Sequence, residues 1–311
     1  MNEQNPRKQH KIKRISFTNI LLIDLFFIGF FLCIFALFHH VIPIRYKKIV
    51  SQPTVTSKVN GDLGDKFASF FSNGKTYQTK DLYISEKLRV QLTIVQQDGI
   101  TYYLEEFFLR DIHNLRSAFA ENTYGKSVRD QTINIAKSHH AIAAINGDNY
   151  GLGKNRSAVI RNGVLFRDSA DGDVLVLFTN GTMEIVSEDQ FDGERLIKNG
   201  AYQAWNFGPS LLNEGKAMES FNTRINQKNP RTAIGYFEPG HYCFIVVDGR
   251  QAGYSTGMTM TELSKLFESL GCKLAYNLDG GKTSVMTFLD KIVNKPFAGG
   301  RETTDIIYIS E

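Results

Sequence analysis

The sequence predicts an α+β fold: a single large domain with mixed sheets and a βαβ unit, preceded by one N-terminal transmembrane helix. Three observations lead to this prediction. Short apolar runs of strand length recur along the chain and end in Asp-Gly or Asn-Gly turns. A helical pattern separates two of these runs between residues 242 and 278. A longer apolar segment, which begins at residue 20, is of the length that crosses a bilayer.

The βαβ unit is predicted from two apolar runs, 242–247 and 274–278, which have the length and composition of buried strands. Between them, Thr259 and Glu262 have the spacing of a capping box, and apolar residues follow at helical intervals. Gly271 is the expected end of this helix. Because a helical crossover joins them, we expect the two strands to be parallel.

Acidic residues follow both strands, which points to a site at one edge of the sheet. Asp248 and Asp279 each come directly before a glycine at the expected strand ends. Parallel strands end on the same edge, where ligands of α/β sheets bind. A third run, 141–145, ends in Asn146 and Asp148. Such Asp-Gly and Asn-Gly steps also form simple turns, but three of them after strands favour a shared site.

The remaining elements are predicted from periodicity and turn residues. Alternating apolar residues indicate half-buried strands, and Asn-Gly or Asp-Gly between two such runs indicates a hairpin. In chain order these elements are a hairpin of 88–95 and 101–109, a short helix at 115–121, a helix at 127–138, hairpins at 158–166 and 174–186, a polar loop or lid at 213–228, and a final strand at 305–309.

The amino terminus has the pattern of an uncleaved membrane anchor. We expect a basic cytoplasmic tail at 1–19, a transmembrane anchor at 20–41, a stalk at 42–80 and the folded domain at 81–311. No small-residue cleavage site follows the apolar segment. Basic residues before it outnumber those just after it, which favours a cytoplasmic amino terminus and an extracytoplasmic domain. Asp24 lies near the cytoplasmic end, where a carboxylate reaches the interface at little cost.

The distribution of charge indicates which kinds of partner the protein can bind. The net charge is +4, and much of that excess lies in the basic tail. The rest of the chain is close to neutral, so we expect the membrane as a partner but no nucleic acid.

The chain has three cysteines. Cys33 lies in the apolar segment, while Cys243 and Cys272 lie in or beside the βαβ strands. A disulfide between the last two is sterically feasible, but their apolar surroundings favour free thiols.

Two arginines lie near the predicted edge. Arg231 follows a proline that fixes the local backbone, and Arg250 follows the turn at Asp248. Arginines suit bidentate recognition of a phosphate or carboxylate, but they could equally pair with the carboxylates of the site itself. A cleft rich in Asp and Asn is also compatible with a hard divalent cation, and no other cofactor is indicated.

Six segments in this order resemble the phosphodiester glycosidases related to the lysosomal "uncovering enzyme". They are Ala144-Ile145-Asn146-Gly147-Asp148-Asn149-Tyr150, Phe207-Gly208-Pro209-Ser210, Pro230-Arg231-Thr232-Ala233-Ile234-Gly235, Val247-Asp248-Gly249-Arg250, Gly257-Met258-Thr259 and Asn277-Leu278-Asp279-Gly280-Gly281. The resemblance spans residues 82–309. It implies an α+β domain with a polar cleft that hydrolyses the glycosidic bond of a sugar-1-phosphodiester of the N-acetylglucosamine-1-phosphate type. It also implies a role in cell-surface polysaccharide metabolism, since many bacterial members are anchored or exported.

The resemblance also assigns expected roles to residues. The expected catalytic carboxylates are Asp279 and Asp148, with Asp248 as a third candidate. Arg231 and Arg250 are expected to hold the phosphate. The remaining residues expected to bind substrate are Asn146, Asn277, Gly280, Gly281, Thr283 and Ser284.

One departure from the family pattern bears on specificity. Lys282 stands where the family usually has a small residue. Its cation could bind an anionic substrate, point to solvent or block the cleft. The alternative to an enzyme is therefore a non-catalytic carbohydrate-binding or exopolysaccharide assembly protein with the same fold.

Overall fold

The computed structural model describes residues 16–36, 47–48, 63, 65–151, 157–222 and 224–311. The chain forms two units, Met1–Tyr46 and Lys47–Glu311. In the first, helix α1 spans Phe17–Ala36. Its segment Phe17–Phe35 has a mean hydropathy of 2.3 and is not buried by other parts of the chain, and within the described residues it is the helix long and apolar enough to cross a membrane.

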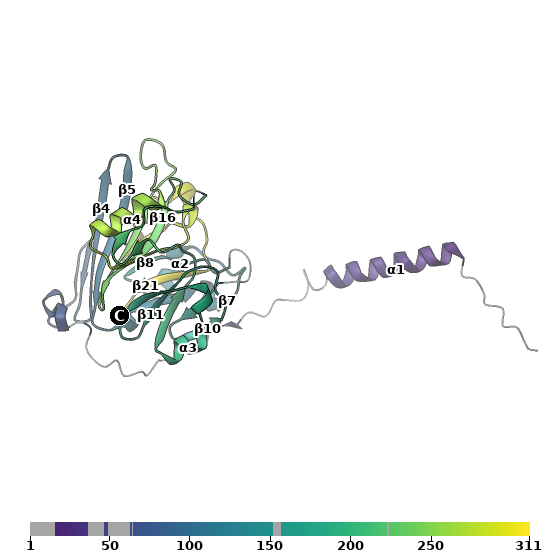
Figure 1. The fold of residues 1–311 in the computed structure, drawn as a ribbon, viewed down its shortest axis with the longest axis horizontal. Coiled ribbons are helices and arrows are strands. Elements are labelled where there is room, and N and C mark those ends of the chain that lie inside the picture. Colours follow the sequence, from purple (N-terminus) through teal and green to yellow (C-terminus); the bar gives the residue numbers. More distant parts are fainter. Residues whose placement is uncertain (1–15, 37–46, 49–62, 64, 152–156, 223) are drawn as a thin grey trace, which may run out of the picture. The chain divides into compact units, whose positions relative to one another are not determined.

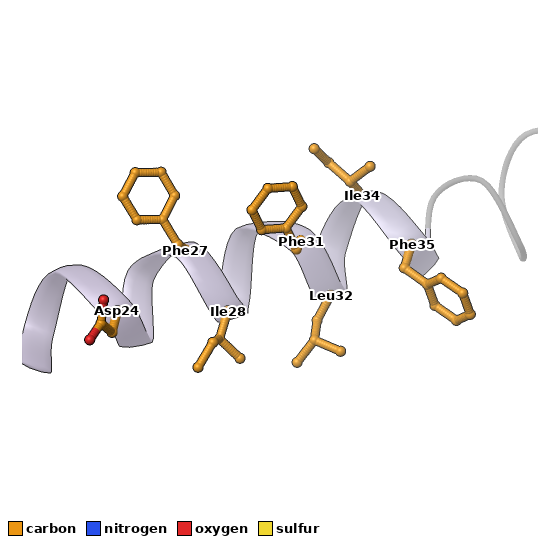
Figure 2. Close-up of a pocket in the computed structure, with 7 residues that line it drawn as sticks. All are labelled: Asp24, Phe27, Ile28, Phe31, Leu32, Ile34 and Phe35. Atoms are coloured by element: carbon orange, nitrogen blue, oxygen red, sulfur yellow. The ribbon is translucent and has the colours of Figure 1, made fainter.

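Helix α1 accounts for most of the predicted anchor. It begins a few residues before the expected start at residue 20, and residues 37–41 of the predicted anchor lie outside the described part of the chain. Figure 2 shows large apolar side chains, among them Phe27 and Phe31, projecting from the helix. Asp24 lies one turn before Ile28 on the same side of the helix.

The second unit is built on a seven-stranded sheet whose paired strands are antiparallel. Across the sheet the strands are β18 (Leu274–Asn277), β16 (Arg231–Glu238), β17 (His241–Val247), β5 (Ile100–Leu109), β4 (Leu88–Gln97), β3 (Leu82–Ile84) and β2 (Tyr77–Gln78).

Two five-stranded antiparallel sheets accompany it. One has the order β20 (Lys291–Ile292), β19 (Met286–Phe288), β8 (Ala143–Asn146), β21 (Asp305–Ile309) and β6 (Leu115–Phe119). The other has the order β10 (Val164–Arg167), β9 (Val159–Arg161), β13 (Ala201–Trp205), β11 (Val174–Phe178) and β12 (Met183–Val186). Two short ribbons pair β1 (Lys47–Lys48) with β7 (Thr123–Tyr124), and β14 (Leu212–Asn213) with β15 (Lys216–Ala217).

The core lies where one face of the seven-stranded sheet packs against both smaller sheets. Phe244, Trp205 and Ile307 represent the three sheets in this one cluster. The opposite face of each sheet is covered by a helix (Figure 1): α4 (Met260–Ser269), α2 (Thr132–Ser138) and α3 (Gly193–Lys198) in that order. Short 3₁₀ helices complete the fold: η2 (Asp65–Phe70), η3 (Ile112–Asn114), η4 (Ala120–Asn122), η5 (Glu188–Gln190), η6 (Gly281–Thr283) and η7 (Phe297–Gly299).

The predicted α+β class is confirmed, and the central helix forms as expected. The Thr259 side chain accepts a hydrogen bond from the Glu262 amide at 3.0 Å, and the Glu262 carboxylate accepts one from the Thr259 amide at 2.7 Å. This reciprocal pair satisfies two of the backbone donors that a helix start leaves free. Gly271 follows the helix with φ +83°, the conformation that ends helices.

The predicted βαβ unit needs one correction. Strands β17 and β18 do run in the same direction, but β16 lies between them and is antiparallel to both. The pairings of the described strands are antiparallel rather than mixed, because the segment before β17 folds back on it as a tight hairpin. The carboxyl ends of β17 and β18 still lie on one edge, together with the start of β16.

The predicted hairpins are confirmed, whereas three other assignments change. The segment 115–121 is mostly strand β6, because Leu115 to Phe119 pair with β21 along their whole length. The polar segment 213–228 includes strand β15 instead of being wholly a loop. The helix predicted at 127–138 is shorter and begins at Thr132.

Part of the predicted stalk belongs to the folded domain. The sequence predicts a stalk over 42–80, but Phe67 and Phe71 pack against Phe108 of β5. Strand β2 then joins the seven-stranded sheet through β3. The aromatic side chains of this segment bury against the sheet, so the folded unit starts before residue 81. Residues 49–62 and 64 lie outside the described part.

Cys243 and Cys272 are buried free thiols, as favoured by their apolar surroundings. A Cβ atom on Gly235 would lie 2.7 Å from the Cys243 sulfur and 2.9 Å from the Cys272 sulfur. Both sulfurs therefore pack over Gly235, and a larger residue at this position would clash with them.

Glu105 is an unpaired acid in the main core, and its replacement is expected to stabilise the protein. It is fully buried on β5 between Leu92 and Phe244 of the neighbouring strands, and both carboxylate oxygens lack hydrogen bonds to any described residue. Burial raises the pKa of Glu105 well above its ordinary value. Folding therefore costs free energy at pH 7, where the unfolded side chain is ionised.

We expect Glu105→Leu to raise the free energy of unfolding at pH 7 by at least about 1 kcal/mol. The gain should shrink as the pH falls towards 4, where the unfolded carboxyl also takes up a proton. Thermal unfolding of both chains between pH 4 and pH 8 measures this difference. A gain of the same size at every pH would contradict the explanation by ionisation.

Candidate active site

Asp279 lies at the edge where β18 ends and β16 begins. Its Oδ2 accepts hydrogen bonds from Asn149 Nδ2 at 2.8 Å, Thr283 Oγ1 at 2.6 Å and Arg301 Nη2 at 3.0 Å. Its Oδ1 has no hydrogen bond to any described residue. One oxygen is thus fixed by three donors and the other is free to act on a ligand. The Asp279 side chain is 7% exposed.

Asn146 connects the sheets beneath this site. Its Nδ2 donates to the Asp279 carbonyl at 2.7 Å, and its Oδ1 accepts from Thr232 Oγ1 at 2.9 Å and from the Val285 amide at 3.3 Å. The side chain is fully buried. Its donor and acceptor are engaged within the protein, so the structure places Asn146 in the support of the site.

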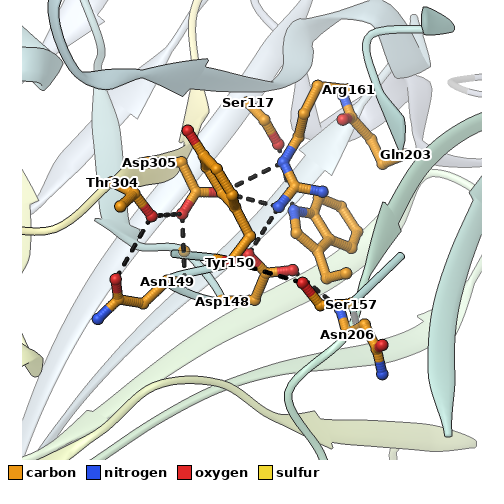
Figure 3. Close-up of polar contacts among 12 residues, drawn as sticks. Ser117, Asp148, Asn149, Tyr150, Ser157, Arg161, Gln203, Asn206, Thr304 and Asp305 are labelled. Carbon is orange, nitrogen blue, oxygen red and sulfur yellow. Dashed lines mark hydrogen bonds and ion pairs between the residues drawn. The ribbon is translucent and has the colours of Figure 1, made fainter. Parts of the chain in front are cut away.

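Asp148 is also buried. Its Oδ1 accepts from Arg161 Nη2 at 2.7 Å, and its Oδ2 accepts from the Asn206 amide at 2.8 Å. Arg161 binds a second carboxylate, Asp305, at 2.8 Å. Figure 3 shows these groups around the guanidinium. Since the Asp148 side chain is 0% exposed, the structure places it inside a buried ionic cluster.

Asp248 secures the loop that follows β20. Its Oδ1 accepts from Asn294 Nδ2 at 2.8 Å, and its Oδ2 accepts from the Lys295 amide at 2.9 Å and from Tyr254 Oη at 2.8 Å. Burial raises the pKa of Asp248 above its ordinary value. Asn294 also donates to the Ser284 carbonyl at 3.1 Å. Asp248 is thus connected to the Asp279 loop, but its own oxygens are engaged.

Arg231 and Arg250 form a cationic pair. Arg231 is buried and donates to backbone carbonyls, from Nε to Met258 at 2.9 Å and from Nη2 to Ile225 at 2.7 Å. Burial, with a smaller effect of nearby Arg250, lowers the pKa of Arg231 to about 10. Arg250 donates from Nε to Asn229 Oδ1 at 2.9 Å. Within the described chain neither guanidinium pairs with a carboxylate, so this pair has positive charge to offer an anion.

Two buried oxygens at the same edge have no hydrogen-bond partner in the part of the chain that the structure describes. Asn277 donates from Nδ2 to the Gly208 carbonyl at 2.7 Å, but its Oδ1 has no hydrogen bond. The Ser284 hydroxyl is likewise buried and unpaired. Thr283 is fully engaged, since it donates to Asp279 and accepts from Arg301 Nη2 at 2.6 Å. Buried polar atoms are normally paired, so Asn277 and Ser284 retain capacity for a ligand or water.

Gly280 and Gly281 bring the Asp279 loop against the start of β16. A Cβ atom on Gly280 would lie 2.8 Å from the Pro230 carbonyl oxygen. Gly281 has φ +69° and donates its amide to the same carbonyl at 3.0 Å. A Cβ atom there would lie 3.4 Å from Arg250 Nη1. Lys282 follows with an exposed side chain, so the two glycines place the loop beside a guanidinium.

The structure adds residues that the sequence does not predict. Arg301 and Asn149 contact Asp279 directly, and Arg161 and Asp305 form the buried cluster. Asn149 directly follows the Asn-Gly-Asp step at 146–148, but Arg161 and Asp305 lie on other strands without a local motif. Within the described residues no group of three His, Cys, Asp or Glu side chains could hold a metal ion, so the divalent cation considered from the sequence has no carboxylate cluster there.

The comparisons with known proteins define the class. The family model described as phosphodiester glycosidase matches residues 139–310. The fold is similar to the catalytic domain of zebrafish N-acetylglucosamine-1-phosphodiester alpha-N-acetylglucosaminidase, auto-inhibited by its pro-peptide, with a TM-score of 0.58, 18% identity, and coverage of 76% of this chain and 88% of that one. A hypothetical protein from Synechocystis gives a TM-score of 0.55 at 12% identity, over 72% and 62% of the two chains.

A curated relative is the SPbeta prophage-derived uncharacterized protein YomE of Bacillus subtilis, 32% identical over 197 residues. That match covers 60% of this chain but only 30% of the relative. The similar structures show that this fold is shared with the catalytic domain of a glycosidase. The chain belongs to the phosphodiester glycosidase family, since the family model covers more than half of it, and the predicted resemblance is confirmed.

Proposed function

We propose that this protein is an extracytoplasmic hydrolase that cleaves the glycosidic bond of a sugar-1-phosphodiester, of the N-acetylglucosamine-1-phosphate type, in cell-surface polysaccharide metabolism. One observation carries the proposal. Arg231 and Arg250 have no carboxylate partner among the described residues, and they lie at the edge where Asp279 has a free oxygen. This combination suits an anionic leaving group beside an acid or nucleophile.

The membrane part of the proposal rests on the amino terminus. Helix α1 would span the cell membrane once, with the basic tail in the cytoplasm and the folded domain outside. A surface polymer would then be within reach of the anchored domain. The zebrafish protein of similar fold is by its name a phosphodiester glycosidase, which agrees with the chemistry proposed for this chain.

In the proposed reaction the bond between the anomeric carbon and the phosphate oxygen breaks. Its electron pair stays on the phosphate, whose charge Arg231 and Arg250 stabilise. Asp279 Oδ1 either attacks the anomeric carbon, forming a glycosyl ester that water then hydrolyses, or takes a proton from a water that attacks this carbon directly, the two roles that glycosidases give to a carboxylate. A phosphate leaves without much help from an acid. A second carboxylate with a free oxygen is therefore not required, and the engaged oxygens of Asp148 and Asp248 are consistent with this scheme.

The sugar would lie on the side of Asp279 away from the phosphate and from the two arginines that bind it. Asn277 Oδ1 is a free acceptor for a sugar hydroxyl. Phe207, 41% exposed, precedes Gly208, whose carbonyl holds the Asn277 amide. Its ring offers an apolar face for the C–H face of a pyranose.

Removal of the Arg250 charge should affect phosphodiesters selectively. We expect Arg250→Gln to lower kcat/KM for a sugar-1-phosphodiester by about 10- to 100-fold, because a charge-assisted contact to the leaving phosphate is lost. The same change should leave hydrolysis of an uncharged aryl glycoside nearly unaltered. Arg195→Gln is the control, since that arginine is 60% exposed on α3. Equal losses on both substrates would contradict phosphate recognition by Arg250.

The function itself is tested with the full chain in detergent. It is incubated with methyl N-acetylglucosamine-1-phosphate, other sugar-1-phosphate diesters and a nucleotide sugar, and free sugar is assayed. Release of sugar is the expected result. No release from any diester, with glycan binding retained, would replace the proposal by the non-catalytic binding protein and make Lys282 the next residue to change.

A further inference from the structure

The ionic cluster behind the site has more negative than positive charge. Arg161 donates from Nε and Nη2 to Asp305 Oδ2 at 3.1 and 2.8 Å, and from Nη2 to Asp148 Oδ1 at 2.7 Å. Both carboxylate side chains are 0% exposed, and the Arg161 side chain is 1% exposed. One guanidinium therefore neutralises only one of the two carboxylates if both are ionised. An excess charge buried in this way is costly unless it has further donors.

One of those donors is Asn149, which also contacts Asp279. The Asn149 amide donates to Asp305 Oδ1 at 3.3 Å, and Thr304 Oγ1 lies 3.4 Å from both Asp305 Oδ1 and Asn149 Oδ1 (Figure 3). Asn149 has φ +49°, in the left-handed region that Asn adopts more readily than most residues. Its Nδ2 then donates to Asp279 Oδ2 at 2.8 Å.

Gly147, which precedes Asp148, shows how closely the loop packs against the Asp305 carboxylate. A Cβ atom on Gly147 would lie 2.5 Å from the Asp305 carboxyl carbon. The Gly147 amide donates to the Asp305 carbonyl at 2.9 Å. Only glycine allows the loop to pass directly over Asp305, so the loop that carries Asn149 is fixed against the cluster.

We propose that Arg161, Asp305 and Asn149 are positioning residues that hold the Asp279 carboxylate in its reactive orientation, and that Asp148 belongs to this support. The proposal rests on the proposed function insofar as Asp279 is the reacting group. Asp305 fixes the Asn149 backbone, and the Asn149 side chain fixes one oxygen of Asp279. The other oxygen is thereby aimed at the substrate.

The cluster gives this support a pH dependence. Burial, together with the charge of Asp148, raises the pKa of Asp305 to about 7, although Arg161 acts in the opposite direction. The phenol of Tyr150 also interacts with Asp305, and burial raises its pKa, so it stays neutral. Below pH 7 Asp305 takes up a proton and becomes a weaker acceptor for Asn149. The hold on Asp279 therefore weakens as the pH falls through about 7.

The test compares the pH profile of kcat for the full wild-type chain with that of Asp305→Asn. For the wild type we expect kcat to fall below pH 7 by up to about tenfold per pH unit. Asp305→Asn is neutral at every pH, like the protonated acid, so its kcat should show no inflection and should stay near the low value that the wild type reaches below pH 7. Asn149→Ala should lower kcat by about 10- to 100-fold with little change in KM. An inflection that persists in Asp305→Asn would overturn the proposal.

The fluorescence of Trp205 reports the ionisation of the cluster in the absence of substrate. Trp205 is the single tryptophan of the chain, and it precedes Asn206, whose amide binds Asp148. We expect its emission to titrate near pH 7 in the wild type and not in Asp305→Asn. His113→Gln is the control, because that imidazole contacts Tyr202 of the same strand. Titration without any turnover would contradict the proposed function alone, and titration retained in Asp305→Asn would contradict the role of Asp305.

Discussion

Asp279→Asn is expected to lower kcat for a sugar-1-phosphodiester by about 10²- to 10⁴-fold, the range for loss of an acid, base or nucleophile. The reason is the asymmetry of this carboxylate. Three donors hold Oδ2, whereas Oδ1 is free. An amide keeps the shape of the side chain but can neither attack carbon nor accept a proton. Initial rates of sugar release at saturating substrate measure the effect.

The matched control is Asp189→Asn, which changes an exposed aspartate on η5. It should leave kcat unchanged. Thermal unfolding of both variants shows whether Asp279→Asn keeps the fold. A folded Asp279→Asn protein with wild-type kcat would remove Asp279 from the chemistry.

Arg161→Met is expected to lower the free energy of unfolding by about 3–5 kcal/mol, because it leaves two buried carboxylates without their cation. Its guanidinium binds Asp148 and Asp305, and all three side chains are buried. Chemical unfolding of the full chain in detergent, followed by Trp205 fluorescence, measures the loss. The loss should diminish as the pH is lowered, since protonated carboxyls no longer need the cation.

A second variant separates charge from packing. Arg161→Met combined with Asp305→Asn removes one of the two orphaned charges, so it should recover part of the lost stability. Arg195→Met, at an exposed arginine of α3, should change stability by less than about 0.5 kcal/mol. A loss below about 1 kcal/mol for Arg161→Met would show that the cluster does not stabilise the fold.

Local patterns are sufficient to predict elements whose stability is local. The capping box of α4 and the hairpin turns at Asn162 and Asn180 depend on residues a few positions apart, and the structure contains them. The helix predicted over strand β6 is wrong, because the pairing of β6 with β21 joins residues nearly 200 positions apart in the sequence. The insertion of β16 between β17 and β18 escapes prediction for the same reason, since strand order is set by tertiary pairing.

In the site, too, the features that depend on local sequence could be predicted, whereas those that depend on tertiary contacts could not. Residues after strand ends, among them Asp279, are predicted from the Asp-Gly steps, and the shared edge follows from strand direction alone. Which carboxylate is accessible depends on burial, so the sequence could not separate Asp279 from Asp148. Arg161 and Asp305 carry no local motif and meet only because β9 and β21 approach each other in the folded chain.

The central claim is that the bond between the sugar and the phosphate oxygen breaks on the sugar side. Hydrolysis of a sugar-1-phosphodiester in water enriched in oxygen-18 tests it directly. Attack at the anomeric carbon puts the label on the hydroxyl of the released sugar and leaves the phosphate unlabelled, which is the expected result. Label in the phosphate would mean attack at phosphorus, and the protein would then be a phosphodiesterase rather than a glycosidase.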